Sequence, residues 1–274
     1  MRLFRRPAYY GLPRGAFPLK EKCNPRIVVP VFDFLVTWQT AAAFLLAFLA
    51  GLMRGYTGFG TPIFLAPIYA VLFGPQATVP LLIIMEIGVM VQMVPAAWPK
   101  ADLKEIAGLV AGCAVLLPVG AFMLHVLDPF VVKKAIGLMT LLFVAMLAFG
   151  WRYRGPRNTA VRVATGAVSG FCNGLTGIGA PPAILYYLSG DTAIAVMRAN
   201  LVVYFAFITF IAVPSFLYLG LISLETVWRW VLLSIPLLGG VAIGSRLFHG
   251  TSEKMYIRAA LATLAVAGVI GILG

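Results

Sequence analysis

Two short glycine-rich segments contain the residues of this chain that are best suited to binding a ligand. Residues 51–62 read GLMRGYTGFGTP, and residues 170–181 read GFCNGLTGIGAP. Glycines let backbone N–H groups approach a ligand closely, and a helix that begins after them presents its positive end to the same point. Each segment also carries a threonine hydroxyl, and a proline that suits the first turn of the next helix. This combination favours an anion.

The two segments are aligned copies of one motif. Six of their twelve positions are identical, where chance would give about one match. We therefore expect one substrate site built from both copies, with these residues: Arg54, Thr57, Gly58, Gly60 and Pro62 from the first, and Asn173, Thr176, Gly177, Gly179 and Pro181 from the second. The site should be asymmetric, because Arg54 can donate two parallel hydrogen bonds to an oxyanion and its counterpart is Asn173.

A purely structural interpretation of the same residues stays open. Gly51 and Gly55, like Gly170 and Gly174, have the GxxxG spacing that lets membrane helices pack closely. Arg54 could likewise only cap the end of its helix, where a cation stabilises by about 0.3–1 kcal/mol. Two aligned copies that both continue as TGxGxP nevertheless favour a substrate site over packing alone.

Few other ionisable or amide side chains lie deep in the apolar runs. Glu86 falls near the middle of one run, and Arg198 and Asn200 fall early in the corresponding run of the second half. Intramembrane ionisable residues are informative because they are costly to bury. Glu86 could carry a coupling proton, or it could neutralise Arg54 or Arg198 as a structural pair.

The elements that must position these residues are apolar helices. The chain has 274 residues, of which 61% are hydrophobic and 11% charged, and its mean hydropathy is +0.97. Apolar runs of near-spanning length recur from about residue 33 to the end, so we expect an all-α polytopic membrane protein with two homologous halves. The segments expected in the first half are a (33–53), b (62–73), c (77–98), d (103–126) and e (130–150), and those in the second half are 160–173, 181–188, 193–219, 224–247 and 254–273.

Each half contains a glycine-rich break between segments a and b. Segment b is too short to cross a bilayer, which takes about 20 helical residues, so it is a re-entrant half-helix or the second part of a broken helix. If segments a and b together make one crossing, the chain crosses about eight times and its halves run parallel. If segment b crosses fully, each half has five crossings and the halves are inverted. The charges of the connecting loops favour the eight-segment arrangement.

We divide the chain into a basic N-terminal arm (1–30), a first membrane repeat (31–150) and a second membrane repeat (151–274). The arm lacks the apolar core of a signal peptide. It either serves only as an orientation signal, which we favour, or also contacts anionic lipid head groups. The positive-inside rule places the arm, the loop with Lys100 and Lys104 and the loop with Arg152, Arg154 and Arg157 in the cytoplasm. We therefore expect both termini on the cytoplasmic side of the membrane.

Several other functions are disfavoured. The net charge of +12 is concentrated in short segments between apolar runs, which argues against nucleic-acid binding. The three cysteines and two histidines have no metal-ligand spacing, and no nucleophile–base set is present, so we expect no metal, no cofactor and no enzymatic activity. No lysine follows the glycines in the spacing of a nucleotide-binding loop.

The motifs TGFGTPIFLAP and TGIGAPPAILYYLSGDTAIAVMRANL resemble those of the TauE/SafE family, the sulfite exporter-like membrane proteins. The resemblance covers roughly residues 36–273. It implies a bacterial inner-membrane transporter of about eight segments that moves small anions such as sulfite or organosulfonates, with a proton or ion as a possible coupling partner. An anion channel, a transporter of a different small solute and a non-transporting scaffold stay as alternatives.

Overall fold

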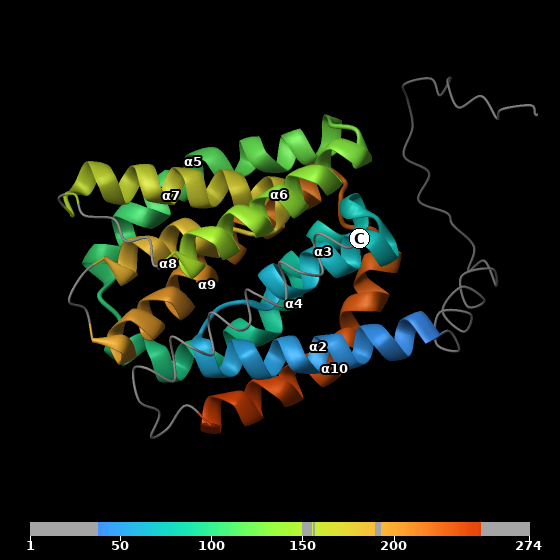
Figure 1. Ribbon diagram of the computed structural model, residues 1–274, viewed down its shortest axis with the longest axis horizontal. Coiled ribbons are helices and arrows are strands. Elements are labelled where there is room, and N and C mark those ends of the chain that lie inside the picture. Colours follow the sequence, from blue (N-terminus) through green and yellow to red (C-terminus); the bar gives the residue numbers. More distant parts are fainter. Residues whose placement is uncertain (1–37, 150–154, 156, 190–192, 248–274) are drawn as a thin grey trace, which may run out of the picture. The chain divides into compact units, whose positions relative to one another are not determined.

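The described part of the chain is helical throughout, and its helices are separated by short turns at glycine and proline. The computed structural model describes residues 38–149, 155, 157–189 and 193–247, and these contain no strand. The N-terminal arm and the expected segment 254–273 lie outside the described residues. The helices, shown in Figure 1, are α2 (Trp38–Thr57), α3 (Thr61–Phe73), α4 (Pro75–Ala97), the 3-10 turn η2 (Trp98–Lys100), α5 (Leu103–Val126), α6 (Pro129–Ala148), α7 (Thr159–Thr176), α8 (Ala180–Leu188), α9 (Ile194–Tyr218) and α10 (Leu224–Leu247).

Helices α2 and α3 form an antiparallel hairpin that turns at the first glycine break. The Tyr69 hydroxyl in α3 donates a hydrogen bond of 2.8 Å to the carbonyl oxygen of Ala43 in α2. A straight helix would separate these two residues by about 40 Å, so the chain must fold back on itself. Helices α7 and α8 fold back in the same way, since Val161 and Tyr186 line one cavity. Each hairpin returns the chain towards the end where it began, which differs from the single net crossing that we expected.

The two halves of the described chain run in opposite directions. The start of α9 packs on the first break, where Arg198 and Val202 lie beside Gly58, and the start of α4 packs on the second, where Leu82 lies beside Gly177. At its other end, α4 approaches α9 again through Trp98, whose ring centroid is 6.4 Å from that of Phe207. Helices α4 and α9 are therefore antiparallel although they are equivalent in sequence. The repeats are inverted, not parallel as we expected, because each hairpin adds one reversal of direction.

Four helices pair closely across the two halves. Helix α2 lies along α10, and α5 lies along α7 (Figure 1). A Cβ atom at Gly51 would collide with the backbone of Leu237, and one at Gly174 would collide with the backbone of Leu117. The GxxxG pairs therefore act as packing surfaces, as the structural interpretation proposed, while the TGxG residues that follow form the turns. Each pair consists of one helix from each half, so the two halves pack closely against each other.

The outer helices carry the apolar surface of a membrane protein. Five described helices are long and apolar enough to cross a bilayer: α2, α4, α5, α9 and α10. Large apolar side chains on outer helices are exposed, as at Val115, Phe122, Leu138, Phe210 and Ile235. Buried tyrosines and phenylalanines fill the interior instead, including Tyr69, Tyr204 and Phe59. Such a surface is stable against lipid and unstable in water, so the chain is an integral membrane protein.

The two ends of the helix assembly differ in charge. We call one end the basic end; there α5, α7 and α9 begin and α2, α4 and α10 finish. It carries Lys100, Lys104, Arg157, Arg162, Arg198 and Arg246 with Asp102 and Glu105. The opposite end carries Lys133, Lys134 and Arg229 with Asp128 and Glu225. Helix α2 starts at this opposite end, whereas we expected the arm before it to share the side of the 99–104 and 151–158 loops.

Candidate functional site

The first break is a tight turn that only glycine can make without strain. Gly58 and Gly60 have φ angles of 83° and 113°, in the left-handed region that disfavours other residues. The Thr57 hydroxyl bonds to the local backbone, donating to the carbonyl oxygen of Met53 at 2.7 Å and lying 3.3 Å from the amide nitrogen of Phe59. Thr57 therefore stabilises the turn itself.

The second break repeats this design with one change. The Thr176 hydroxyl donates to the carbonyl oxygen of Cys172 at 2.7 Å and accepts from the amide of Ile178 at 3.2 Å. Gly177 has φ of 75°, but Gly179 has an ordinary helical φ of −97°. Gly179 is needed for space instead, because a Cβ atom there would lie 2.6 Å from Cβ of Asn173.

A small enclosed cavity lies between the two breaks. Five of the ten expected substrate-site residues line it, together with Glu86 and residues from α3, α4, α8 and α9. The lining is Arg54, Pro62, Ile63, Leu82, Ile83, Glu86, Asn173, Gly177, Ile178, Gly179, Ala180, Phe205, Ile208 and Thr209. Its volume, about 10 Å³ for the centre of a water-sized sphere, suits one water molecule and is too small for an oxyanion. The protein is thus described in a closed conformation.

The other expected site residues lie around this cavity without lining it. Both threonines and Gly58 form the turns, and Gly60 and Pro181 belong to the starts of α3 and α8. Conversely, the sequence did not point to Phe205 and Thr209 on α9, because a phenylalanine and a threonine in an apolar helix carry no distinguishing signal.

A buried ion pair forms one wall of the cavity. Arg54 Nη2 lies 2.6 Å from Glu86 Oε2, and the two side chains are only 3% and 9% exposed. The Arg54 guanidinium also lies 5.0 Å from the ring centroid of Phe205, in cation–π geometry. Of the two partners considered for Glu86, the structure selects Arg54. Removing one member would leave a buried charge unpaired, at a cost of about 3–5 kcal/mol.

Three polar atoms of the cavity-lining side chains have no hydrogen-bond partner among the described residues. They are Arg54 Nε, Glu86 Oε1 and Asn173 Nδ2, and each belongs to a residue at least nine-tenths buried. An unsatisfied buried polar group costs about 1–3 kcal/mol, so native proteins retain few without a function or a bound molecule. The cavity therefore offers two hydrogen-bond donors and one acceptor to a polar ligand.

Two helix N-termini add positive potential to the same cavity. Pro62 and Ile63 of α3 and Ala180 of α8 line it, so the first turns of both short helices face it. Each N-terminus carries the equivalent of roughly half a positive charge. Proline near each start removes one N–H that would otherwise lack a partner.

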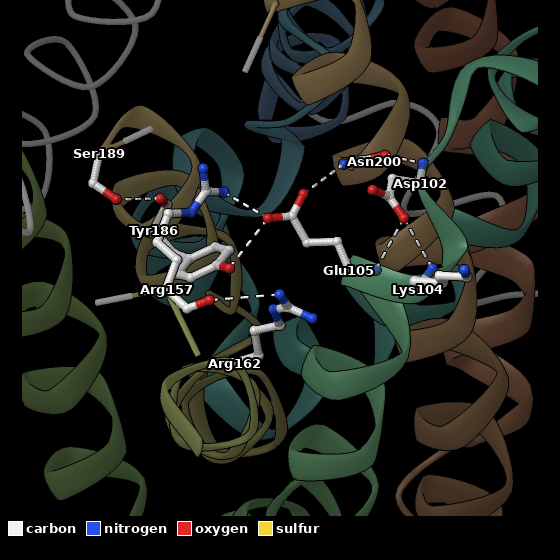
Figure 2. Close-up of polar contacts among 8 residues, drawn as sticks. All are labelled: Asp102, Lys104, Glu105, Arg157, Arg162, Tyr186, Ser189 and Asn200. Carbon is white, nitrogen blue, oxygen red and sulfur yellow. Dashed lines mark hydrogen bonds and ion pairs between the residues drawn. The ribbon is translucent and has the colours of Figure 1, made fainter. Parts of the chain in front are cut away.

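Arg198 and Asn200 belong to different contacts from those of the cavity. Arg198 Nη2 donates to the carbonyl oxygen of Gly55 at 2.5 Å, near the C-terminal end of α2. Asn200 joins a polar network at the basic end, shown in Figure 2, where its Nδ2 donates to Glu105 Oε2 at 3.3 Å and its Oδ1 accepts from the amide of Asp102 at 2.7 Å.

Glu105 is the centre of this network. Its Oε1 lies 2.6 Å from Arg157 Nη2 and accepts a 3.1 Å hydrogen bond from the Tyr186 hydroxyl. The Arg157 guanidinium also stacks 4.6 Å from the centroid of the Tyr186 ring (Figure 2). The network joins the start of α5, the segment before α7, the end of α8 and the start of α9. Sequence reasoning missed it because Glu105 is an ordinary residue in the first turn of a helix.

Two larger cavities are poor candidates for an anion. One, of about 420 Å³, lies between α6, α7 and α8, and the other, of about 520 Å³, lies between α4 and α9. Neither has a charged side chain in its lining. A desolvated anion would find no countercharge there, whereas the small cavity between the breaks provides one.

One comparison with known proteins identifies a family for this chain. No curated protein and no solved structure matches the chain. A family match covers residues 43–272, under the description "Sulfite exporter TauE/SafE". This range contains both breaks, the Arg54–Glu86 pair and the Glu105 network, and it spans most of the 274 residues. The chain belongs to the sulfite exporter TauE/SafE family.

Proposed function

We propose that this protein is a secondary transporter that carries small anions, namely sulfite or organosulfonates, across the bacterial inner membrane. One observation carries the proposal: Arg54, Asn173 and the first turns of α3 and α8 line a single enclosed cavity between the two breaks. In this proposal the substrate binds there, between groups contributed by both halves. The family match supports a membrane transporter, and the cavity supports an anion as its cargo.

The charges around the cavity favour a small anion over a cation or a neutral solute. Arg54 and Glu86 neutralise each other, and the first turns of α3 and α8 face the cavity with backbone N–H groups, which bind anions. The unpaired guanidinium and amide N–H groups match the acceptor-rich surface of an oxyanion. A cation would find only one free carboxylate oxygen, and it would face both helix starts.

The inverted halves suggest how access could alternate. Inverted repeats can exchange conformations, so that a site between them opens first to one side and then to the other. Here α4 and α9, which cross next to the cavity, pack on the break of the opposite half. The cavity must widen from about the size of one water to admit its substrate, so binding is coupled to movement of these helices.

The charge distribution supports an orientation. The described cations gather at the basic end, and Arg152 and Arg154 fall in the segment that connects α6 with α7. By the positive-inside rule this end faces the cytoplasm, and the start of α2 then faces the opposite side.

Flux into proteoliposomes tests the proposal. Purified protein is reconstituted, and uptake of labelled sulfite, sulfate, sulfoacetate and taurine is followed with and without a pH gradient. We expect saturable uptake of sulfite or a sulfonate that Arg54→Ala removes and the loop variant Arg152→Ala leaves intact. Uptake equal to that of empty liposomes for all four compounds would refute the proposal, and uptake that never saturates would favour a channel.

A further inference from the structure

The unpaired atoms of the small cavity constrain the protonation state of the ligand as well as the sign of its charge. Two of them, Arg54 Nε and Asn173 Nδ2, are donors, and the third, Glu86 Oε1, is an acceptor. A fully deprotonated oxyanion has only acceptor atoms, so it could satisfy the two donors and would face the Glu86 carboxylate oxygen with a like charge. A ligand that also carries an O–H group can satisfy all three atoms.

The net charge around the cavity also favours a singly charged ligand over a doubly charged one. The ion pair contributes no net charge, because Arg54 and Glu86 compensate each other. The N-termini of α3 and α8 contribute roughly half a positive charge each, and the C-terminal ends of α2 and α7, from which Arg54 and Gly177 also line the cavity, contribute roughly half a negative charge each. The helix ends therefore add little net charge, and a dianion would bring twice the uncompensated charge of a monoanion into a buried site.

We infer that this site takes its oxyanion in the singly charged, monoprotonated form, with the ligand O–H donated to Glu86 Oε1 and other ligand oxygens bound by Arg54 Nε and Asn173 Nδ2. The inference rests on the proposed function and specifies the ligand of the same site. For sulfite, the bound species is hydrogen sulfite and not the dianion. Glu86 then selects a protonation state in addition to holding Arg54 in place.

Besides Glu86, one other charged side chain near the cavity could change ligand affinity with pH. Arg54 of α2 is the only other ionisable side chain in the lining formed by described residues. The lining residues from α3, α7, α8 and α9 are apolar or neutral, with Asn173 and Thr209 as the polar ones. The Thr209 hydroxyl already donates to the carbonyl oxygen of Phe205 at 2.9 Å. A change of affinity with pH therefore has few possible sources: the ligand, Glu86 or Arg54.

Calorimetric titration of the purified wild-type protein tests the inference. Affinity for total sulfite is measured across the pH range in which sulfite loses its second proton, and methanesulfonate, a monoanion with no O–H, is the matched control. We expect sulfite affinity to fall by up to about tenfold per pH unit once the dianion predominates. Methanesulfonate should bind more weakly than hydrogen sulfite, with an affinity that does not change over the same range.

The outcomes separate this inference from the function on which it rests. Sulfite affinity that is constant or rises with pH would overturn the inference and leave the transporter proposal standing. A parallel fall for methanesulfonate would also overturn it, because the titrating group would then belong to the protein. Failure of sulfite and of every sulfonate to bind at any pH would refute the proposed function itself.

Two variants sharpen the assignment to Glu86. Glu86→Gln raises the net charge of the site by one, so the dianion should become acceptable and the fall in sulfite affinity with pH should vanish or reverse. Asn173→Ala removes a donor without changing charge, so it should weaken both ligands and keep the wild-type pH dependence. A folded Glu86→Gln protein with the wild-type pH dependence would overturn the inference, and if this variant does not fold, the wild-type titrations decide.

Discussion

The two glycine breaks share one backbone design and differ in the chemistry of their side chains. Both have a threonine that bonds to its own turn and a left-handed glycine directly after it, Gly58 or Gly177. Only the first contributes a cation, Arg54, where the second has Asn173. The residues that the copies share build the turns, and the residues in which they differ give the cavity its asymmetry. Duplication thus supplied a symmetric frame in which single substitutions could create an ion pair.

The two ends of the protein show a second contrast between equivalent positions. Glu105 and Glu225 both lie in the first turn of equivalent helices, at opposite ends. The Glu105 side chain is 15% exposed and accepts from three side chains on other elements. The Glu225 side chain is 67% exposed, and it pairs with Arg229 one turn later. In the described conformation Glu105 therefore connects more elements at the basic end than Glu225 does at the other end.

Removing the cation of the first break should have the largest effect. Arg54→Ala leaves Glu86 buried without its partner, which costs about 3–5 kcal/mol of stability and should nearly abolish transport. Arg54→Lys keeps the charge but loses the planar guanidinium with its paired N–H donors. It should therefore fold better than Arg54→Ala and transport weakly. Equal anion affinity of wild-type protein and folded Arg54→Ala, measured by calorimetry, would remove Arg54 from the site.

The comparison of breaks predicts unequal costs for adding a methyl group to their left-handed glycines. At Gly177 a Cβ atom would meet Leu82 at an ordinary 3.5 Å, so Gly177→Ala should cost only the left-handed strain of about 1–2 kcal/mol. At Gly58 it would also lie 2.7 Å from Arg198 Cγ and 3.3 Å from the Arg198 carbonyl oxygen, which adds about 1–3 kcal/mol of overpacking. A melting temperature lowered equally by both variants in detergent would contradict this difference.

The comparison of ends predicts that the two glutamates are not equivalent in function. Glu105→Gln weakens three partly buried contacts and should cost about 1–3 kcal/mol, whereas Glu225→Gln should stay within about 0.5 kcal/mol. If the Glu105 network holds the basic end closed, Glu105→Gln should also increase the labelling of a cysteine placed at Ser189 from the cytoplasm. Unchanged labelling, with Glu225→Gln as the matched control, would show that the network only stabilises the fold.

The inverted arrangement predicts the sides on which the loops lie. In a protein without Cys23, Cys113 and Cys172, single cysteines at residues 152 and 223 should react with an impermeant reagent from opposite sides. Residue 152 should be labelled only from the cytoplasm. Labelling of both from one side would restore the parallel arrangement. Retaining Cys23 alone reports the side of the N-terminal arm, which we expected to be cytoplasmic.

The sequence by itself determined the class of protein, its family and the position of both breaks. These properties are local: hydropathy marks the helices, and glycine, threonine and proline mark a turn wherever they occur in that order. Arg54 could be recognised as a site candidate because a cation beside a break in an apolar run is costly to bury and usually has a function. Five of the ten residues expected to bind substrate line the cavity, because they are close in sequence to the turns.

Only the tertiary structure decided the direction of the halves, the partner of Glu86 and the contribution of α9. A short apolar helix after a break has the same composition whether it continues onward or folds back, so hydropathy could not distinguish a hairpin from a broken helix. The contact between Tyr69 and Ala43 makes that distinction. Arg54 and Glu86 are 32 positions apart, and Phe205 comes from the other half. Which of several buried charges meet depends on how the helices cross, and that is a property of packing that no single segment contains.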